Sequence, residues 1–245
     1  MISRALEIGK KVFFKKGLPC HLVLFITNRC NMECDHCFLV ESGELNDKER
    51  GQVLSIKNIE KLAKSIPNLL ALSITGGEPF LRNDLSKVIK VFASSGYLKS
   101  INLVSNGFQT KQILEKVKII LDENKNIDIF LSISIDGETE IHNKIRKKEN
   151  AFKNAINTIK ELSIISKKNK RLSIGVNSTY VGSNFKSLCK LYKELFSLKL
   201  DYISLNLIRS NTWDTRPKNL NINEYNQLCE LKDKLINSIN KESSF

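Results

Sequence analysis

The chain has 245 residues, of which 41% are hydrophobic, and its formal net charge is +13. This length and apolar content suffice for one substantial core, so we expect a single domain over residues 1–245. No run of about eighteen apolar residues occurs, and the first residues lack the apolar segment of a signal peptide, which argues against a membrane span or secretion. Six cysteines, three of them clustered, fit a reducing compartment, and we expect a cytoplasmic protein.

Short apolar runs alternate with helical patterns along the chain. The apolar runs predict β-strands at residues 22–26, 70–75, 100–105, 128–135, 172–180 and 202–208. The patterns between and after them predict helices near 57–66, 84–95, 109–122, 150–165, 184–197 and 223–240, with Asp84 and Asn184 as N-caps and Pro67 and Gly96 as stops. This alternation predicts an α/β fold with a parallel sheet, whose functional residues lie where the strands end.

Three cysteines follow the first predicted strand at the spacing CxxxCxxC: Cys30, Cys34 and Cys37. Three thiolates on one short loop can bind three corners of a [4Fe-4S] cluster and leave the fourth iron open to another ligand. Two other interpretations stay open, namely three buried cysteines on one helix face and a zinc site completed by His36. The other cysteines, Cys20, Cys189 and Cys229, are interpreted as single thiols.

The second predicted strand ends in Thr75-Gly76-Gly77-Glu78-Pro79. The two glycines permit unusual dihedral angles and a close backbone approach, and Glu78 supplies a negative charge. Taken alone, this segment is explained equally well by an ordinary turn. Coupled to the cysteine loop, it favours a functional turn over an ordinary one.

The cysteine loop and the Gly-Gly-Glu-Pro turn, in this order, resemble the CxxxCxxC and GGEP motifs of the radical S-adenosylmethionine (SAM) enzymes. The resemblance implies an incomplete (β/α)6 barrel, a [4Fe-4S] cluster on the three cysteines, and SAM at the open iron. An electron from a flavodoxin- or ferredoxin-type donor would cleave SAM into methionine and a 5′-deoxyadenosyl radical. That radical would take a hydrogen atom from a peptide, a protein or a small biosynthetic intermediate.

The same resemblance implies which residues contact SAM. His36 takes the position before the last cysteine, which in this family packs near adenine, and the turn from Gly76 to Pro79 would receive the amino group. The period-two pattern of the fourth predicted strand places Ser132, Ser134 and Asp136 on one side. Of these, Ser134 and Asp136 would bind the ribose hydroxyls, as in the similar SxDG segment of the family. Further candidate contacts are Asn177, for the same ligand, and Arg209, for the SAM carboxylate or the substrate.

The segment from His142 through Arg146 to Phe152 resembles the HxxIR…F pattern of the radical SAM subgroup with a SPASM or twitch extension, many of whose members modify peptides or enzyme subunits. His142 and Arg146 are interpreted as bracing a helix start, with a role in positioning SAM or substrate as the alternative. The auxiliary clusters of that subgroup need further cysteines after the barrel, and here only Cys229 follows the sixth predicted strand. The sequence leaves open whether the chain is a minimal enzyme or part of a longer one.

The ends of the chain and its charge carry weaker signals. Residues 1–20 are interpreted as an N-terminal extension and 210–245 as a C-terminal loop and helix, with Trp213 as a packing anchor. Residues 141–171 hold ten Lys and Arg against two Glu, a stretch interpreted as a solvated helix face. The basic stretch leaves an RNA-modifying radical SAM enzyme as one alternative. A second alternative is a non-catalytic binding module in which an iron–sulfur cluster or zinc has a structural role.

Overall fold

The computed structural model describes residues 19–46, 53–94, 96–198, 200–208 and 220–242, so Arg209 and Trp213 lie outside the described residues. Six strands form one sheet in the order β1-β2-β3-β4-β5-β6, and each neighbouring pair is parallel. They are β1 (His21–Phe25), β2 (Ala71–Thr75), β3 (Ser100–Ser105), β4 (Asp128–Ser134), β5 (Leu172–Tyr180) and β6 (Tyr202–Leu207). The predicted parallel α/β fold is confirmed, and every predicted strand end lies within one residue of the observed end.

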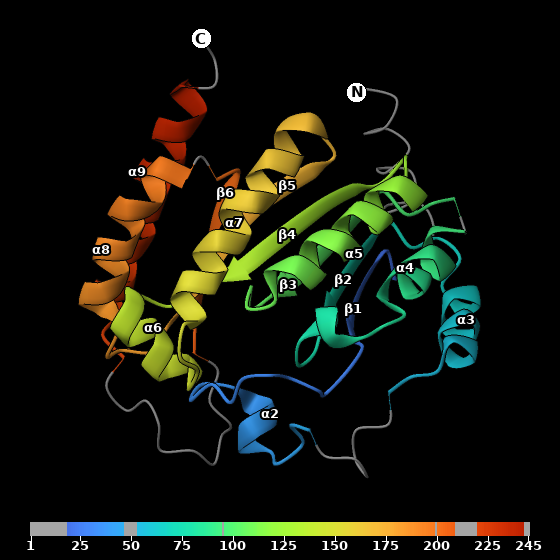
Figure 1. The fold of residues 1–245 in the computed structure, drawn as a ribbon, viewed down its shortest axis with the longest axis horizontal. Helices are drawn as coiled ribbons and strands as arrows, with labels where there is room; N and C mark the ends of the chain where they lie inside the picture. The colour runs from blue at the N-terminus through green and yellow to red at the C-terminus, as the bar shows by residue number, and fades with distance from the viewer. Residues whose placement is uncertain (1–18, 47–52, 95, 199, 209–219, 243–245) are drawn as a thin grey trace.

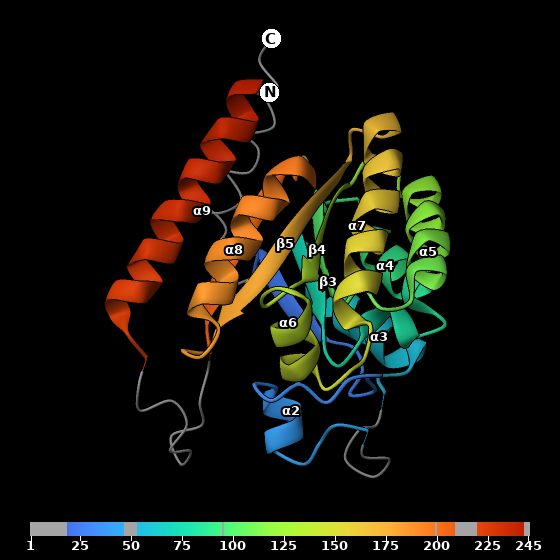
Figure 2. The ribbon, with the colours of Figure 1, turned by 60° about the vertical axis from the view of Figure 1, so that its left-hand side comes forward.

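Helices connect the strands and lie over one face of the sheet, as Figures 1 and 2 show for α4, α5, α7 and α8. The helices are α2 (Phe38–Glu41), α3 (Ile56–Ser65), α4 (Leu85–Ala93), α5 (Thr110–Glu123), α6 (Thr139–Arg146), α7 (Ala151–Lys168), α8 (Phe185–Leu195) and α9 (Ile222–Glu242), with short 3₁₀ turns at Pro79–Leu81 and Phe196–Leu198. Neither α2 nor α6 was among the predicted helix ranges, although His142 and Arg146 were interpreted as part of a helix start, and both helices border the candidate site. No helix in the described ranges is long and apolar enough to span a bilayer.

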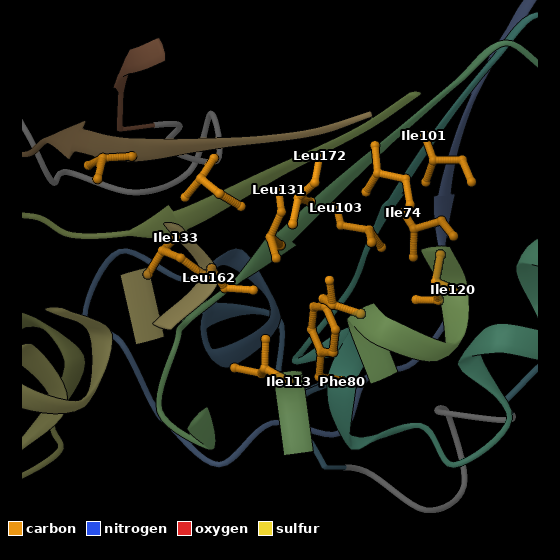
Figure 3. Close-up of a cluster of buried hydrophobic side chains, with 14 of the residues drawn as sticks. Ile74, Phe80, Ile101, Leu103, Ile113, Ile120, Leu131, Ile133, Leu162 and Leu172 are labelled. Atoms are coloured by element: carbon orange, nitrogen blue, oxygen red, sulfur yellow. The ribbon is translucent and has the colours of Figure 1, made fainter. Parts of the chain in front are cut away.

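Strand alternation places the hydrophobic core between the sheet and the helices. Ile74, Leu103, Leu131 and Ile174 stand opposite one another across four strands and are almost completely buried. Phe80, Ile113 and Ile120 pack against this row from the helix side (Figure 3). Burying such side chains contributes about 1.5–3 kcal/mol each, which fixes the register of every strand.

The face of the sheet turned away from these helices is called the inner face. Across five strands it carries the row Val23, Ser73, Asn102, Phe130 and Ser173, which pair in register. Polar side chains on this face bond to one another: Asn102 donates to Ser73 over 3.3 Å, and Ser132 lies 3.0 Å from the hydroxyl of Tyr202. The inner face is therefore largely neutral and polar, although Val23 and Phe25 on β1 are about half exposed.

Asp84 and Asn184 stand at the N-cap positions of α4 and α8, as predicted, but neither side chain caps its helix. Asp84 instead binds the guanidinium of Arg82, with 2.6 Å between its Oδ1 and Nε. Asn184 bridges the ends of β4 and β5. The helix starts were thus predicted correctly. The two side chains, however, form contacts with residues outside their own helices.

Candidate metal centre

The cysteine loop follows β1 at the carboxyl edge of the sheet and is fixed at its first cysteine by Asn46. The backbone N–H of Cys30 donates to Asn46 Oδ1 over 3.0 Å, and Asn46 Nδ2 donates to the Cys30 carbonyl over 3.2 Å. Asn46 itself has a φ of 58°, a left-handed conformation that asparagine tolerates well. One amide side chain therefore holds both backbone polar groups of Cys30.

The end of α6 holds the middle of the loop. The backbone N–H of Asp35 donates to the carbonyl of Ile145 over 2.9 Å, and Lys147 Nζ lies 2.9 Å from Asp35 Oδ1. Arg146 Nη1 donates to Cys34 Sγ over 3.7 Å. Figures 1 and 2 show the blue segment before α2 passing close to α6. The HxxIR segment therefore belongs to the candidate metal centre rather than to a remote helix start.

The two glycines of the turn pack against the start of the cysteine loop. Gly77 N–H donates to the carbonyl of Thr27 and Glu78 N–H to that of Arg29, both over 2.7 Å. A Cβ at Gly76 would lie 2.3 Å from Thr27 O, and one at Gly77 would lie 2.2 Å from Arg29 O. The two glycines thus let the backbone of the turn approach the backbone of the cysteine loop closely. This contact ties the cysteine loop to the end of β2.

Glu78 is buried, with 3% of its surface exposed, and Pro79 beside it is also buried at the start of the 3₁₀ turn. The Glu78 carboxylate accepts hydrogen bonds from the backbone N–H of Asn106 (2.7 Å), the hydroxyl of Ser105 (3.0 Å) and the N–H of Phe80 (3.1 Å). Burial raises the pKa of Glu78 to about 7, against the effect of these hydrogen bonds. Glu78 therefore joins the end of β3 to the turn.

Asn106 completes this connection, because its Nδ2 donates to Asn31 Oδ1 over 2.7 Å and lies 3.9 Å from Cys30 Sγ. Asn106 and Asn46 contact the cysteine loop but were not among the predicted site residues. Asn106 follows a predicted strand end, which was a usable signal. Asn46 lies in a turn 16 residues after Cys30, and no local pattern marks it.

The predicted ribose contacts separate into two groups. Ser134 and Asn177 pair in register on the inner face, where Asn177 Oδ1 accepts from Asn206 Nδ2 over 2.6 Å. Asp136 is fully buried, and its Oδ1 accepts from the N–H of Thr179 over 2.9 Å while its Oδ2 pairs with Arg146 Nη2 at 2.6 Å. The carboxylate of Asp136 is therefore already engaged by the protein.

His36 lies between the cysteines and this ion pair, with its Nε2 3.9 Å from Asp136 Oδ2. Burial lowers the pKa of His36, although the negative charge of Asp136 opposes the shift. The same burial acts on the neighbouring thiols and raises the pKa of Cys30 to about 11. A bare Cys30 thiol therefore stays protonated at neutral pH, and a bound metal would have to displace its proton.

The donor set fits an iron–sulfur cluster. Within the described ranges, no three His, Cys, Asp or Glu side chains converge on one point that could hold a single ion. A cubic cluster does not require such convergence, because each of the three thiolates binds a different iron. Around the cysteines, the buried nitrogens Asn31 Nδ2, His36 Nδ1 and Arg146 Nε have no protein partner in the described structure. Buried polar atoms of this kind need a partner, and cluster sulfur or a bound polar ligand would supply one.

The fold and this site define a class of parallel α/β proteins with a three-thiolate metal loop at the carboxyl edge of the sheet. The sequence matches the radical SAM superfamily over residues 24–185, about two thirds of the chain. The chain therefore belongs to the radical SAM superfamily, a class of enzymes whose cofactors are a [4Fe-4S] cluster and SAM. The predicted family is confirmed.

Relatives support the predicted subgroup as well. An uncharacterised protein of Methanocaldococcus jannaschii is 28% identical over 85% of this chain and 69% of its own length. The sporulation killing factor maturation protein SkfB of Bacillus subtilis is 32% identical over 60% of this chain and 33% of SkfB. Streptococcus suis SuiB bound to SAM shares the fold, with a TM-score of 0.70 at 18% identity over 97% of this chain and 52% of SuiB. This chain thus spans about a third of SkfB and half of SuiB.

We expect the stability difference between the wild type and His142→Asn to depend on pH. His142 Nδ1 accepts the backbone N–H of Asp136 over 3.0 Å, and burial, together with the charge of Arg146, lowers its pKa to about 3. The unfolded state therefore binds more protons between about pH 3 and pH 6.5, and the stability that neutral His142 contributes is lost as the pH falls through this range. From pH 7 to pH 5 the loss should be about 2 kcal/mol.

Urea unfolding of the two proteins at pH 7 and pH 5 measures this difference. Asparagine can accept the same N–H without titrating, so the variant should lose less stability than the wild type on acidification. Glu78 acts in the opposite direction, because its raised pKa makes its contribution largest at low pH and removes it as the pH rises through about 7. Both proteins retain Glu78, so its effect cancels, and an equal acid response in the two would contradict the prediction.

Proposed function

We propose that this chain is a peptide-modifying radical SAM enzyme. The observation that carries the proposal is the cysteine loop, which Asn46 holds at Cys30 and α6 holds at Cys34 and Asp35. Cys30, Cys34 and Cys37 would bind the [4Fe-4S] cluster. When bound, the cluster supplies the electron that cleaves SAM to methionine and a 5′-deoxyadenosyl radical, which abstracts hydrogen from the substrate.

The chain's own residues would orient SAM and exclude water from it. His36, mostly buried beside the last cysteine, would pack near adenine. Ser134 and Asn177 lie opposite each other on the inner face, where their polar groups would bind the ribose. The turn from Gly76 to Pro79 would bring the negative charge of Glu78 close to the SAM ammonium. Asp136, which the protein already engages, would act on this site by holding Arg146.

A peptide is the substrate class that the site and the relatives favour. SkfB is named for the maturation of a killing factor, and SuiB has also been solved with its precursor peptide SuiA. The inner-face side chains Ser73, Asn102, Asn177 and Asn206 are neutral hydrogen-bonding groups. Such groups suit amides, whereas the phosphates of RNA or a nucleotide call for cationic partners. The electron donor would be a flavodoxin- or ferredoxin-type protein of the cytoplasm.

The test is anaerobic reconstitution with iron and sulfide, followed by dithionite, SAM and chromatography for 5′-deoxyadenosine. Cys34→Ala should lose most of the cluster and all SAM cleavage, because it removes one of three thiolate ligands. Cys189→Ala is the matched control, since this cysteine lies on α8, and it should keep both. Equal iron content in the two variants, or bound zinc without SAM cleavage in the wild type, would overturn the proposed function.

A further inference from the structure

One of the three candidate ligands receives a hydrogen bond from a charged side chain. Among the residues that the structure describes, two side-chain donors reach these sulfurs: Asn106 Nδ2 lies 3.9 Å from Cys30 Sγ, and Arg146 Nη1 lies 3.7 Å from Cys34 Sγ. Asn106 is neutral, whereas the guanidinium of Arg146 is always protonated. Arg146 is only 8% exposed, so water screens its charge weakly. Its electrostatic effect on the Cys34 sulfur is therefore much larger than that of a surface arginine.

Arg146 is held in place by Asp136, which is itself fixed by the strand ends. Asp136 Oδ2 lies 2.6 Å from Arg146 Nη2, and Asp136 Oδ1 accepts the N–H of Thr179. The backbone N–H of Asp136 donates to His142 Nδ1, and its carbonyl accepts from Asn184 Nδ2 over 2.8 Å. The carboxylate, the guanidinium and the sulfur thus form a buried row that begins just after β4.

We propose that this buried Asp136–Arg146 pair sets the reduction potential of the cluster through the sulfur of Cys34. The inference rests on the proposed function, because it requires Cys34 to ligate the cluster. The step concerned is a one-electron reduction, in which an external donor adds negative charge to the cluster. A cation and an N–H···S bond stabilise the reduced form and raise the potential, whereas a nearby carboxylate lowers it. Arg146 and Asp136 are therefore positioning residues that act through Cys34.

This assignment predicts shifts of opposite sign for the two partners. Arg146→Met removes the cation and the donor but leaves the anion, so the midpoint potential should fall. Asp136→Asn removes the anion and leaves the cation, so the potential should rise. The double variant Arg146→Met with Asp136→Asn removes both buried charges, which avoids leaving either one unpaired. Its potential should lie between those of the two single variants.

Redox titration of the reconstituted proteins, monitored by electron paramagnetic resonance without SAM, measures these potentials directly. Arg82→Lys is the matched control, since Arg82 is also a buried arginine paired with an aspartate, at 2.6 Å from Asp84, and it contacts none of the three cysteines. That variant should lose stability without a change in potential. Arg146→Lys keeps the charge but changes its geometry. Its midpoint potential should therefore shift less from the wild-type value than that of Arg146→Met.

Each outcome bears on the inference separately from the proposed function. Opposite shifts in the two single variants, with an unchanged Arg82→Lys, support it. Equal potentials in the wild type and all Arg146 and Asp136 variants overturn it, as do shifts of the same sign in both. If one of the two single variants fails to fold, a wild-type potential in the other, or a shift of the sign opposite to that expected, overturns it. A wild type that forms no [4Fe-4S] cluster instead contradicts the proposed function itself.

Discussion

Gly77→Ala should destabilise the protein by about 3 kcal/mol or more and abolish cluster assembly. The new Cβ would lie 2.2 Å from the carbonyl oxygen of Arg29 and 2.6 Å from its carbonyl carbon. Both neighbours are backbone atoms, so relief requires the turn and the cysteine loop to separate. Separation breaks the hydrogen bonds that Gly77 and Glu78 make to residues Thr27 and Arg29. Overpacking costs about 1–3 kcal/mol, and each buried polar group left unsatisfied adds a similar amount.

Urea unfolding of the metal-free protein measures the stability term, and iron content after reconstitution measures the effect on the site. Gly96→Ala is the control, because Gly96 has a positive φ of 73° while a Cβ there would meet nothing within 4 Å. It should lose only the cost of placing alanine in the left-handed region, about 1–2 kcal/mol, and keep its iron. A Gly77→Ala protein with normal iron content and the same stability loss as Gly96→Ala would refute the packing argument.

The periodic parts of the fold could be predicted from the sequence because burial enforces them. Strand β2 alternates buried apolar residues with more polar ones, and the apolar half must face the helices, so Leu72 and Ile74 define the orientation of this strand. Helix α6 was not among the predicted helix ranges because only eight residues form it and most of them are polar. Its position is set instead by tertiary contacts, such as the bond from Asp35 to Ile145.

The site shows the same division between local and tertiary information. The three cysteines were predicted because their spacing along the chain already indicates their chemistry, and the Gly-Gly-Glu-Pro turn was interpreted from its place after them and its resemblance to the GGEP motif. The support of Cys30 by Asn46 could not be predicted, since an asparagine in a turn has many local explanations. Asp136 was predicted to bind a ribose from a one-dimensional pattern, and only the fold shows its carboxylate paired with Arg146. A pattern along the chain does not show which distant side chains pair with one another in the fold.

Asn184→Asp should destabilise the protein by about 3 kcal/mol or more, although aspartate caps helices as well as asparagine does. Asn184 is fully buried, and its Nδ2 donates to the carbonyls of Asp136 and Thr179, each over 2.8 Å. A carboxylate cannot donate, so both carbonyls would lose their partner and face a buried negative charge. A side chain that acted only as a helix cap would tolerate the change.

Urea unfolding at pH 7 distinguishes these two roles of Asn184, with Asn150→Asp as the matched control. Asn150 stands at the N-cap position of α7, is exposed and makes no side-chain cap bond, so the same substitution there should change stability by less than about 0.5 kcal/mol. Equal effects at the two positions would show that the bond to Asp136 contributes little. A large loss confined to residue 184 would identify the ends of β4 and β5 as the rigid base on which Asp136, Arg146 and finally Cys34 are held.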